Sequence, residues 1–139
     1  MVNIEVLKLK LKNLAEYIQD LEEVKDVPVE VIKEDKKLRR YVERTLQLSV
    51  ESCLDIGNHI ISDLGLREPA NNRDVFIVLV ENGYLEKHKQ ETFEKMAGFR
   101  NIIIHDYAKI EPEIVFSVLQ KGLVDLRYFA AAVKKHFLA

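Results

Sequence analysis

The side chains best suited to chemistry lie together in the stretch RNIIIHDY, residues 100–107. Arg100 can neutralise a phosphate and the pentacoordinate transition state that forms when the phosphate is attacked. His105 titrates near neutral pH and can shuttle protons. This pair of residue types suits phosphoryl chemistry, and with RNA the 2′-hydroxyl supplies the nucleophile, so that neither a metal nor a protein nucleophile is required. Asn101 and Tyr107 add two further competent groups.

The spacing of these residues limits how they can meet. On a regular helix Arg100 and Tyr107 project about 20° apart, whereas Arg100 and His105 project about 140° apart. One straight helix therefore does not easily direct Arg100 and His105 at one small atom. They converge if the helix bends, if the long arginine side chain curls round, or if a second copy of the chain supplies the missing partner. The spacing thus suggests a composite site across a two-fold interface.

Three isoleucines lie between the arginine and the histidine. We expect Ile103 and Ile104 to anchor the segment, so that the polar residues are held on a stiff support at its edge. A histidine at a helix end is often structural, and a lone tyrosine such as Tyr107 is usually a half-buried packing residue. Spacing by itself therefore leaves a catalytic role and a structural role open.

The apolar residues of the first half repeat every three or four positions, which predicts long amphipathic helices. One helix is expected from Ile4 to Leu21. A second opens near Glu34 or Asp35 and continues towards Leu64. The two should be joined around Pro28 as an antiparallel helical hairpin.

The second half predicts shorter helices and one more long helix. Asn72 is a plausible N-cap for a short helix that Asn82-Gly83 ends. Another helix is expected over residues 86–97, after which Gly98 permits a bend or close packing. Glu111-Pro112-Glu113 is typical of a helix start, and the last helix should reach Phe137. We therefore predict an all-α, up-down bundle of about five helices in one domain, residues 1–139.

Composition limits the classes of function. The net charge is −2, so any site for a polyanion must be local. The densest basic stretch, residues 33–44, fits a solvated helix face somewhat better than a phosphate-binding strip. No apolar run approaches the length of a membrane span, and the amino terminus lacks the pattern of a signal peptide, so we expect a cytoplasmic protein. Cys53 is the only cysteine, and its apolar surroundings predict a buried structural thiol.

Other candidate sites are weaker. Asp55 and His59 are four residues apart, as in some metal sites, but two ligands do not make a site. No phosphate-binding glycine loop or dinucleotide fingerprint is present, so we expect neither a metal nor a cofactor. Whether Arg44, Glu51 or Asp55 on the long second helix reaches the 100–107 segment is left open.

The pattern Arg-x4-His-x-Tyr, with polar Asn101 directly after the arginine, resembles the signature of the ribonucleases of the HEPN superfamily. The most similar group is the HepT-like toxins, which the stretches ESCLDIGNHII and NNRDVFIVLVENGYL also resemble. The resemblance extends over essentially the whole chain, in the order of its helices. It implies a HEPN-like helical fold.

This resemblance implies a homodimer in which two motif helices form a metal-independent, RNA-cleaving cleft. Arg100 would then stabilise the scissile phosphate, His105 would act as general acid and base, and Asn101 would orient the phosphate or the histidine. The resemblance also implies a nucleotidyltransferase antitoxin that adds AMP to Tyr107. A bulky anion there would occlude the cleft and repel RNA.

Two readings from different classes of function follow. The first is an RNA-cleaving toxin that acts through Arg100 and His105 at a dimer interface. The second is a non-catalytic helical module that binds nucleotide or RNA, or docks a nucleotidyltransferase. A purely structural helical dimer is a third. The complete motif favours the enzyme.

Overall fold

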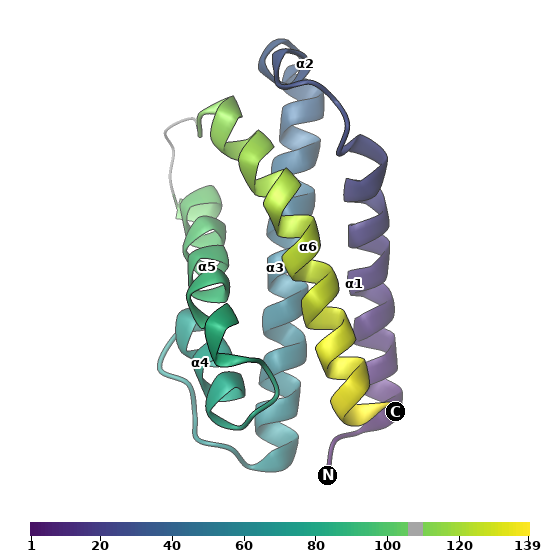
Figure 1. The fold of residues 1–139 in the computed structure, drawn as a ribbon, viewed down its shortest axis with the longest axis vertical. Coiled ribbons are helices and arrows are strands. Elements are labelled where there is room, and N and C mark those ends of the chain that lie inside the picture. The colour runs from purple at the N-terminus through teal and green to yellow at the C-terminus, as the bar shows by residue number, and fades with distance from the viewer. Residues whose placement is uncertain (106–109) are drawn as a thin grey trace.

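The computed structural model describes residues 1–105 and 110–139, except for the side chain of His105. Within these residues the chain forms six α-helices, one short 3₁₀ helix and no strand (Figure 1). The elements are α1 (Ile4–Val24), α2 (Val29–Glu34), α3 (Lys36–Leu64), α4 (Asn72–Glu81), η1 (Lys87–Lys89), α5 (Gln90–His105) and α6 (Pro112–Phe137). The predicted all-α bundle is therefore confirmed, with one helix more than the expected five.

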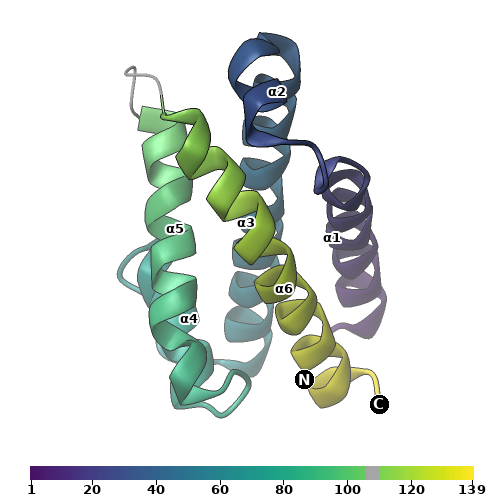
Figure 2. The same cartoon turned by 45° about the horizontal axis from the view of Figure 1, so that its top comes forward.

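The long antiparallel hairpin is made by α1 and α3, which lie side by side and run in opposite directions (Figure 1). The extra helix, α2, lies in the connection between them at the end of the bundle (Figure 2). It follows Pro28, and its Ile32 is buried in the protein, which explains why this link coils rather than running as a simple turn. The carboxylate of Asp35 then caps α3 by accepting the Leu38 N–H at 3.0 Å.

The start of α4 lies close to the prediction. The N-cap is Asn71 rather than Asn72, because the Asn71 Oδ1 accepts the Asp74 N–H at 2.9 Å. Asn72 is instead the first helical residue. The difference of one residue reflects two adjacent asparagines that are equally suited to capping.

Helix α5 corrects one expectation about the motif. It runs without interruption from Gln90 through Gly98 to His105, whereas the sequence predicted a helix ending near Ala97. Gly98 permits close packing rather than a bend, because a Cβ on this residue would lie 2.8 Å from Nη2 of Arg73. Arg100 and Asn101 therefore belong to the same continuous helix as the buried Phe93.

The first half of α5 is anchored by an aromatic cluster. Phe76 of α4, Phe93 of α5 and Phe129 of α6 are fully buried, with ring centroids 5.1 to 6.1 Å apart. Lys89 adds an ion pair of 2.9 Å with Asp125 on α6. These contacts fix the beginning of α5 against two neighbouring helices.

The second half of α5 is less covered than the sequence suggested. Ile102 is 48% exposed, and Ile103 and Ile104 are only half-buried. The physical reason is that α5 packs on α3 and α4 and touches α6 only lightly, so these neighbours cover part of its surface and leave Ile102 outside. The isoleucine triplet thus supports the motif from its edge rather than from within the core.

Two further expectations are confirmed. Cys53 is fully buried, and burial raises the pKa of its thiol. Pro112 lies in the first turn of α6 as predicted.

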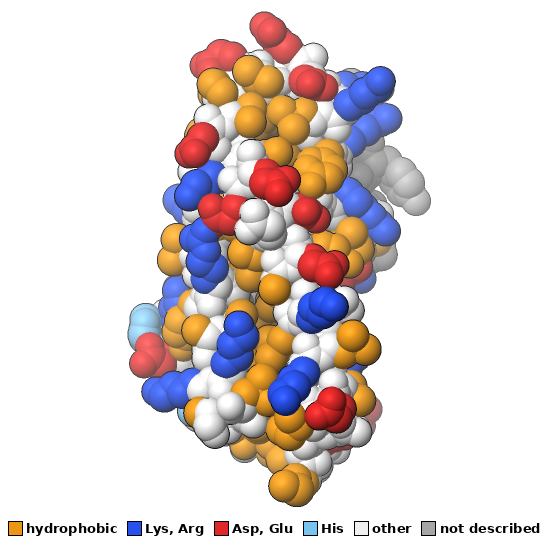
Figure 3. Space-filling model, turned by 90° about the vertical axis from the view of Figure 1, so that its right-hand side faces the viewer, with side chains coloured by type: hydrophobic (Ala, Val, Ile, Leu, Met, Phe, Trp, Pro, Cys, Tyr) orange, Lys and Arg blue, Asp and Glu red, His pale blue; other side chains and the backbone are white. Residues whose placement is uncertain are grey.

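On the face that carries α1, basic and acidic side chains are interspersed (Figure 3). None of the described helices combines the length and the hydropathy that a membrane crossing requires.

Candidate functional site

Arg100 leaves α5 and reaches α3, where it forms an ion pair with Glu51. Its Nε and Nη2 donate to the same carboxylate oxygen, Oε1, at 3.2 and 3.1 Å. The two side chains are 22% and 32% exposed, so the pair lies at the surface edge of the bundle. This contact joins residues 49 positions apart in the sequence.

Two amide side chains extend the contact. Gln47, one turn before Glu51 on α3, donates from Nε2 to the same Oε1 at 3.1 Å. Asn101 accepts the Arg100 Nη1 donor on its Oδ1 at 3.2 Å. We call Gln47, Glu51, Arg100 and Asn101 the arginine network.

The predicted site residues are therefore only partly placed. Arg100 and Asn101 are brought into direct contact. The backbone of His105 ends α5, but its side chain lies outside the described residues, and so does the whole of Tyr107. The roles predicted for these four residues remain proposals.

The sequence left open whether three residues of α3, Arg44, Glu51 and Asp55, reach the motif, and the structure places each of them differently. Glu51 contacts Arg100, as described. Asp55, one turn further, pairs instead with Lys10 of α1 at 2.7 Å. Arg44 is exposed and lies seven residues before Glu51, so it projects about 20° from Glu51 on the same side of the helix. Sequence reasoning named Glu51 without a role, because spacing within one helix cannot identify a partner on another.

The weak metal candidate does not assemble. Asp55 is held by Lys10, while His59 lies 3.3 Å from the carboxylate of Asp63 and 3.4 Å from the carbonyl oxygen of Asn3. Among the side chains that the structure describes, no three from His, Cys, Asp or Glu gather in a way that would hold an ion.

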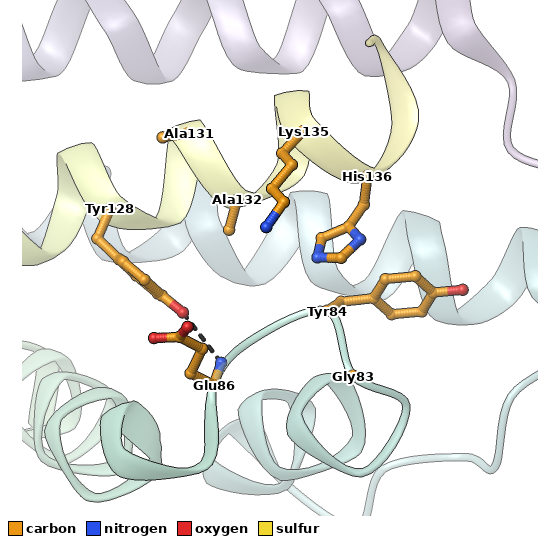
Figure 4. A pocket seen from close by; sticks show the side chains of 8 residues that line it. All are labelled: Gly83, Tyr84, Glu86, Tyr128, Ala131, Ala132, Lys135 and His136. Atoms are coloured by element: carbon orange, nitrogen blue, oxygen red, sulfur yellow. Dashed lines mark hydrogen bonds between the residues drawn. The ribbon is translucent and has the colours of Figure 1, made fainter.

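Three hollows in the surface are candidate sites. One of about 330 Å³ lies between α6 and the loop before η1 (Figure 4), where the Tyr128 hydroxyl accepts the Glu86 N–H at 2.9 Å. His136 packs against the ring of Tyr84 there, with centroids 5.4 Å apart. A second, of about 350 Å³, lies between α5 and α6. Neither is lined by Arg100; only the third, of about 240 Å³ between α1 and α3, includes Glu51.

The antiparallel hairpin and the separate helix that carries Arg-x4-His against it agree with the expected HEPN class of helical proteins. Within this class, the model of the family described as "Ribonuclease HepT-like" matches residues 14–133 of the chain. The chain belongs to the HepT-like ribonuclease family.

Individual relatives agree with this assignment. The chain is 36% identical to the mRNA nuclease HepT of Shewanella oneidensis over 102 residues, which are 73% of this chain and 77% of that protein. It is 24% identical to the tRNA nuclease HepT of Aphanizomenon flos-aquae, over 99% and 95% of the two chains. Among solved structures, a tri-AMPylated HEPN toxin of Shewanella oneidensis in complex with its MNT antitoxin superposes with a TM-score of 0.85. The two chains are 31% identical, and the match covers 94% of this chain and 97% of that one.

Proposed function

We propose that this chain is an endoribonuclease toxin whose site combines Arg100 and His105. The observation that carries the proposal is the arginine network at Arg100 and Asn101, the first two residues of the Arg-x4-His-x-Tyr pattern of the sequence. A guanidinium held at the surface edge of the bundle can contact an RNA phosphate without unfolding of any helix. Family membership and the nuclease relatives support the same conclusion.

The proposed reaction uses the RNA as its own nucleophile. His105 accepts the proton of the 2′-hydroxyl, and the 2′-oxygen attacks the adjacent phosphorus. Arg100 stabilises the charge on the pentacoordinate phosphate. The bond from phosphorus to the 5′-oxygen then breaks, and this oxygen takes a proton from the protonated imidazole of His105, which acts as the general acid. The products are a 2′,3′-cyclic phosphate and a 5′-hydroxyl, and the reaction needs no metal.

The proposed site is shared by two copies of the chain. Helix α5 is continuous from Arg100 to His105, and side chains five residues apart on a regular helix leave it about 140° apart, which supports a site that draws on two copies of the helix. Ile102, which lies between Arg100 and His105 in the sequence, is exposed on the surface of the single chain. Interfaces between copies typically cover exposed apolar side chains. A two-fold axis beside α5 would bring the arginine of one copy towards the histidine of the other.

The proposed control of this activity is AMPylation of Tyr107 by a nucleotidyltransferase antitoxin. A relative that superposes over nearly the whole chain has been solved in AMPylated form with its MNT antitoxin. An AMP group at Tyr107, two residues from His105, would place a phosphate where RNA must bind, and repulsion between like charges would keep RNA away.

The proposed function is tested with unmodified full-length protein, purified without any antitoxin, in the presence of a chelator. It should cleave a 5′-labelled tRNA transcript or a single-stranded mRNA fragment to ends that carry 2′,3′-cyclic phosphate. His105→Ala should abolish cleavage without changing the helical circular dichroism spectrum. Full activity of this variant would exclude His105 as the catalytic base. Wild-type protein that binds both RNAs without cleaving either would instead favour the non-catalytic binding module.

A further inference from the structure

One carboxylate oxygen of Glu51 accepts hydrogen bonds from both Arg100 and Gln47. Oε1 of Glu51 accepts from Arg100 Nε at 3.2 Å, from Arg100 Nη2 at 3.1 Å and from Gln47 Nε2 at 3.1 Å. Glu51 stands on α3, a helix of 29 residues whose adjacent Val50 and nearby Leu54 are buried in the core. The acceptor is therefore mounted on a rigid element, and Gln47 restrains its orientation.

The hydrogen bonds that Glu51 accepts determine which N–H groups of the Arg100 guanidinium remain available to a ligand. An arginine side chain carries five N–H groups. Glu51 uses the Nε–H and one N–H of Nη2, and Asn101 uses one N–H of Nη1. Within the described residues this leaves two N–H groups, one on each terminal nitrogen. Two terminal nitrogens with an N–H each are what a phosphate binds through two of its oxygens.

Arg67 provides a contrast within the same molecule. Its Nη1 and Nη2 donate to the two carboxylate oxygens of Asp74, both at 2.7 Å, and its Nε donates to Glu81 at 2.8 Å. The terminal nitrogens of Arg67 are thus bridged by a carboxylate, as in a structural ion pair. The carboxylate at Arg100 instead bridges Nε and Nη2 through one oxygen, at distances longer than the usual 2.7–2.9 Å of strong charged pairs.

We infer that Glu51 is a positioning residue for RNA cleavage, because it holds Arg100 by the Nε side and leaves N–H groups on both terminal nitrogens for the scissile phosphate. This inference rests on the proposed function. Glu51 does not touch the RNA and acts through Arg100. Gln47 contributes by steadying the carboxylate.

The test compares Glu51→Ala, Glu51→Gln, Arg100→Ala and the double variant E51A/R100A on the same labelled tRNA transcript and mRNA fragment. Loss of positioning should lower the kcat of E51A by about 10²-fold, with KM changed less than about threefold. E51Q keeps an oxygen acceptor without the charge and should lose about tenfold. In the R100A background, E51A should cause no further loss, since the two residues act as one unit.

The matched control is Asp55→Asn. Asp55 lies one turn from Glu51 on the same helix and also forms an ion pair with another helix, through Lys10. D55N should therefore reproduce the loss of an inter-helix pair and leave kcat within about twofold of wild type. Thermal unfolding of all variants separates stability from catalysis, and E51Q, which keeps the shape of the side chain, carries the test if E51A folds poorly.

Each result has a definite meaning. Faster cleavage by E51Q or E51A would show that the carboxylate competes with RNA for Arg100, and would overturn the inference. Losses that multiply in E51A/R100A would show that Glu51 acts independently of the arginine, with the same consequence. Wild-type protein that cleaves while E51A and E51Q match it overturns the inference alone. Wild-type protein that does not cleave either RNA overturns the proposed function, and the inference with it.

Discussion

Nη1 of Arg100 donates a hydrogen bond of 3.2 Å to Oδ1 of Asn101, the next residue in the sequence. Side chains of adjacent residues leave a helix about 100° apart, so this contact requires the arginine to lie along the helix surface. The guanidinium is thereby held from α3 on one side and from its own helix on the other. Asn101, which was predicted to orient the phosphate or the histidine, contacts the arginine in this structure, and its predicted role stays a prediction.

The first prediction concerns this contact. Asn101→Ala should lower kcat for cleavage of the labelled tRNA transcript by about tenfold, because a hydrogen bond to a charged donor contributes about 1.5 kcal/mol. Single-turnover cleavage at saturating protein measures the effect. Asn101→Asp should be more damaging, since a second carboxylate beside Arg100 disfavours phosphate binding. An N101A variant with wild-type kcat would show that Glu51 alone suffices to hold the arginine.

The second prediction concerns the shared site. If Arg100 of one copy works with His105 of the other, then mixing Arg100→Ala with His105→Ala should raise cleavage well above that of either variant alone. When equal amounts of the two variants pair at random, half of all dimers are heterodimers. Each heterodimer has one intact site of two, so about a quarter of wild-type activity is expected. The mixture is refolded together or co-expressed, and the rate is compared with each variant alone. A mixture as inactive as its components would place both residues of the site in the same chain.

The third prediction concerns modification. Co-expression with the nucleotidyltransferase of the proposed toxin–antitoxin pair should add one or more AMP groups to the chain, and Tyr107→Phe should prevent the addition. Intact mass spectrometry measures the increment, and peptide mapping places it. The unmodified Y107F protein should retain cleavage, because the phenolic oxygen is the acceptor of AMP rather than part of the proposed chemistry. AMP found on Y107F would direct the assignment to another residue.

The fourth prediction concerns a close approach of α3 and α4. A Cβ on Gly57 would lie 2.7 Å from Cγ1 of Val75 and 3.3 Å from Cδ1 of Leu79. Gly57→Ala should therefore lower the free energy of unfolding by about 1–3 kcal/mol through overpacking. Thermal or urea unfolding measures it.

The control for this prediction is Gly122→Ala on α6. A Cβ there meets only ordinary contacts, at 3.9 Å from Val118 and 4.0 Å from Leu46. Replacing a helical glycine by alanine should then stabilise the protein by about 0.5–1 kcal/mol. Equal effects of the two substitutions would contradict the close packing at Gly57.

The fifth prediction concerns acid stability. The Arg67 guanidinium and the Ala70 N–H hold the pKa of the Asp74 carboxyl at about 2. A carboxyl whose pKa is lowered by folding stabilises the native state above its unfolded pKa of about 3.9, and this contribution is lost as pH falls towards the folded value. The difference in Tm between wild type and Asp74→Asn should therefore be constant above about pH 5 and shrink below about pH 4. Thermal unfolding from pH 7 to pH 3 measures it.

The exposed pair of Glu91 and Lys95 supplies the control for the acid series. Both side chains are largely exposed, and the oxygen and nitrogen lie 3.2 Å apart. Such a pair contributes little, so Glu91→Gln should change Tm only slightly at every pH. A difference for D74N that stays constant down to pH 3 would show that the Arg67 pair does not depend on the charge of Asp74.

Much of the fold follows from the sequence because it is locally encoded. Apolar residues at helical spacing located α1, α3 and α6, and Asp35 and Pro112 marked where two of them begin. These signals act within a few residues, so they survive without knowledge of the neighbours. The short α2 was missed because a helix of six residues has too few turns to show a periodic pattern.

The site divides along the same line. The identity of Arg100, Asn101, His105 and Tyr107 as a chemical group, and the angular divergence of the arginine and histidine, followed from the sequence alone. Spacing predicts which face of a helix is apolar, but it does not say which helix will cover that face or at what height. The exposure of Ile102, the close packing at Gly98 and the contact of Glu51 with Arg100 depend on those two quantities, and only the packing of α5 against α3 and α4 decided them.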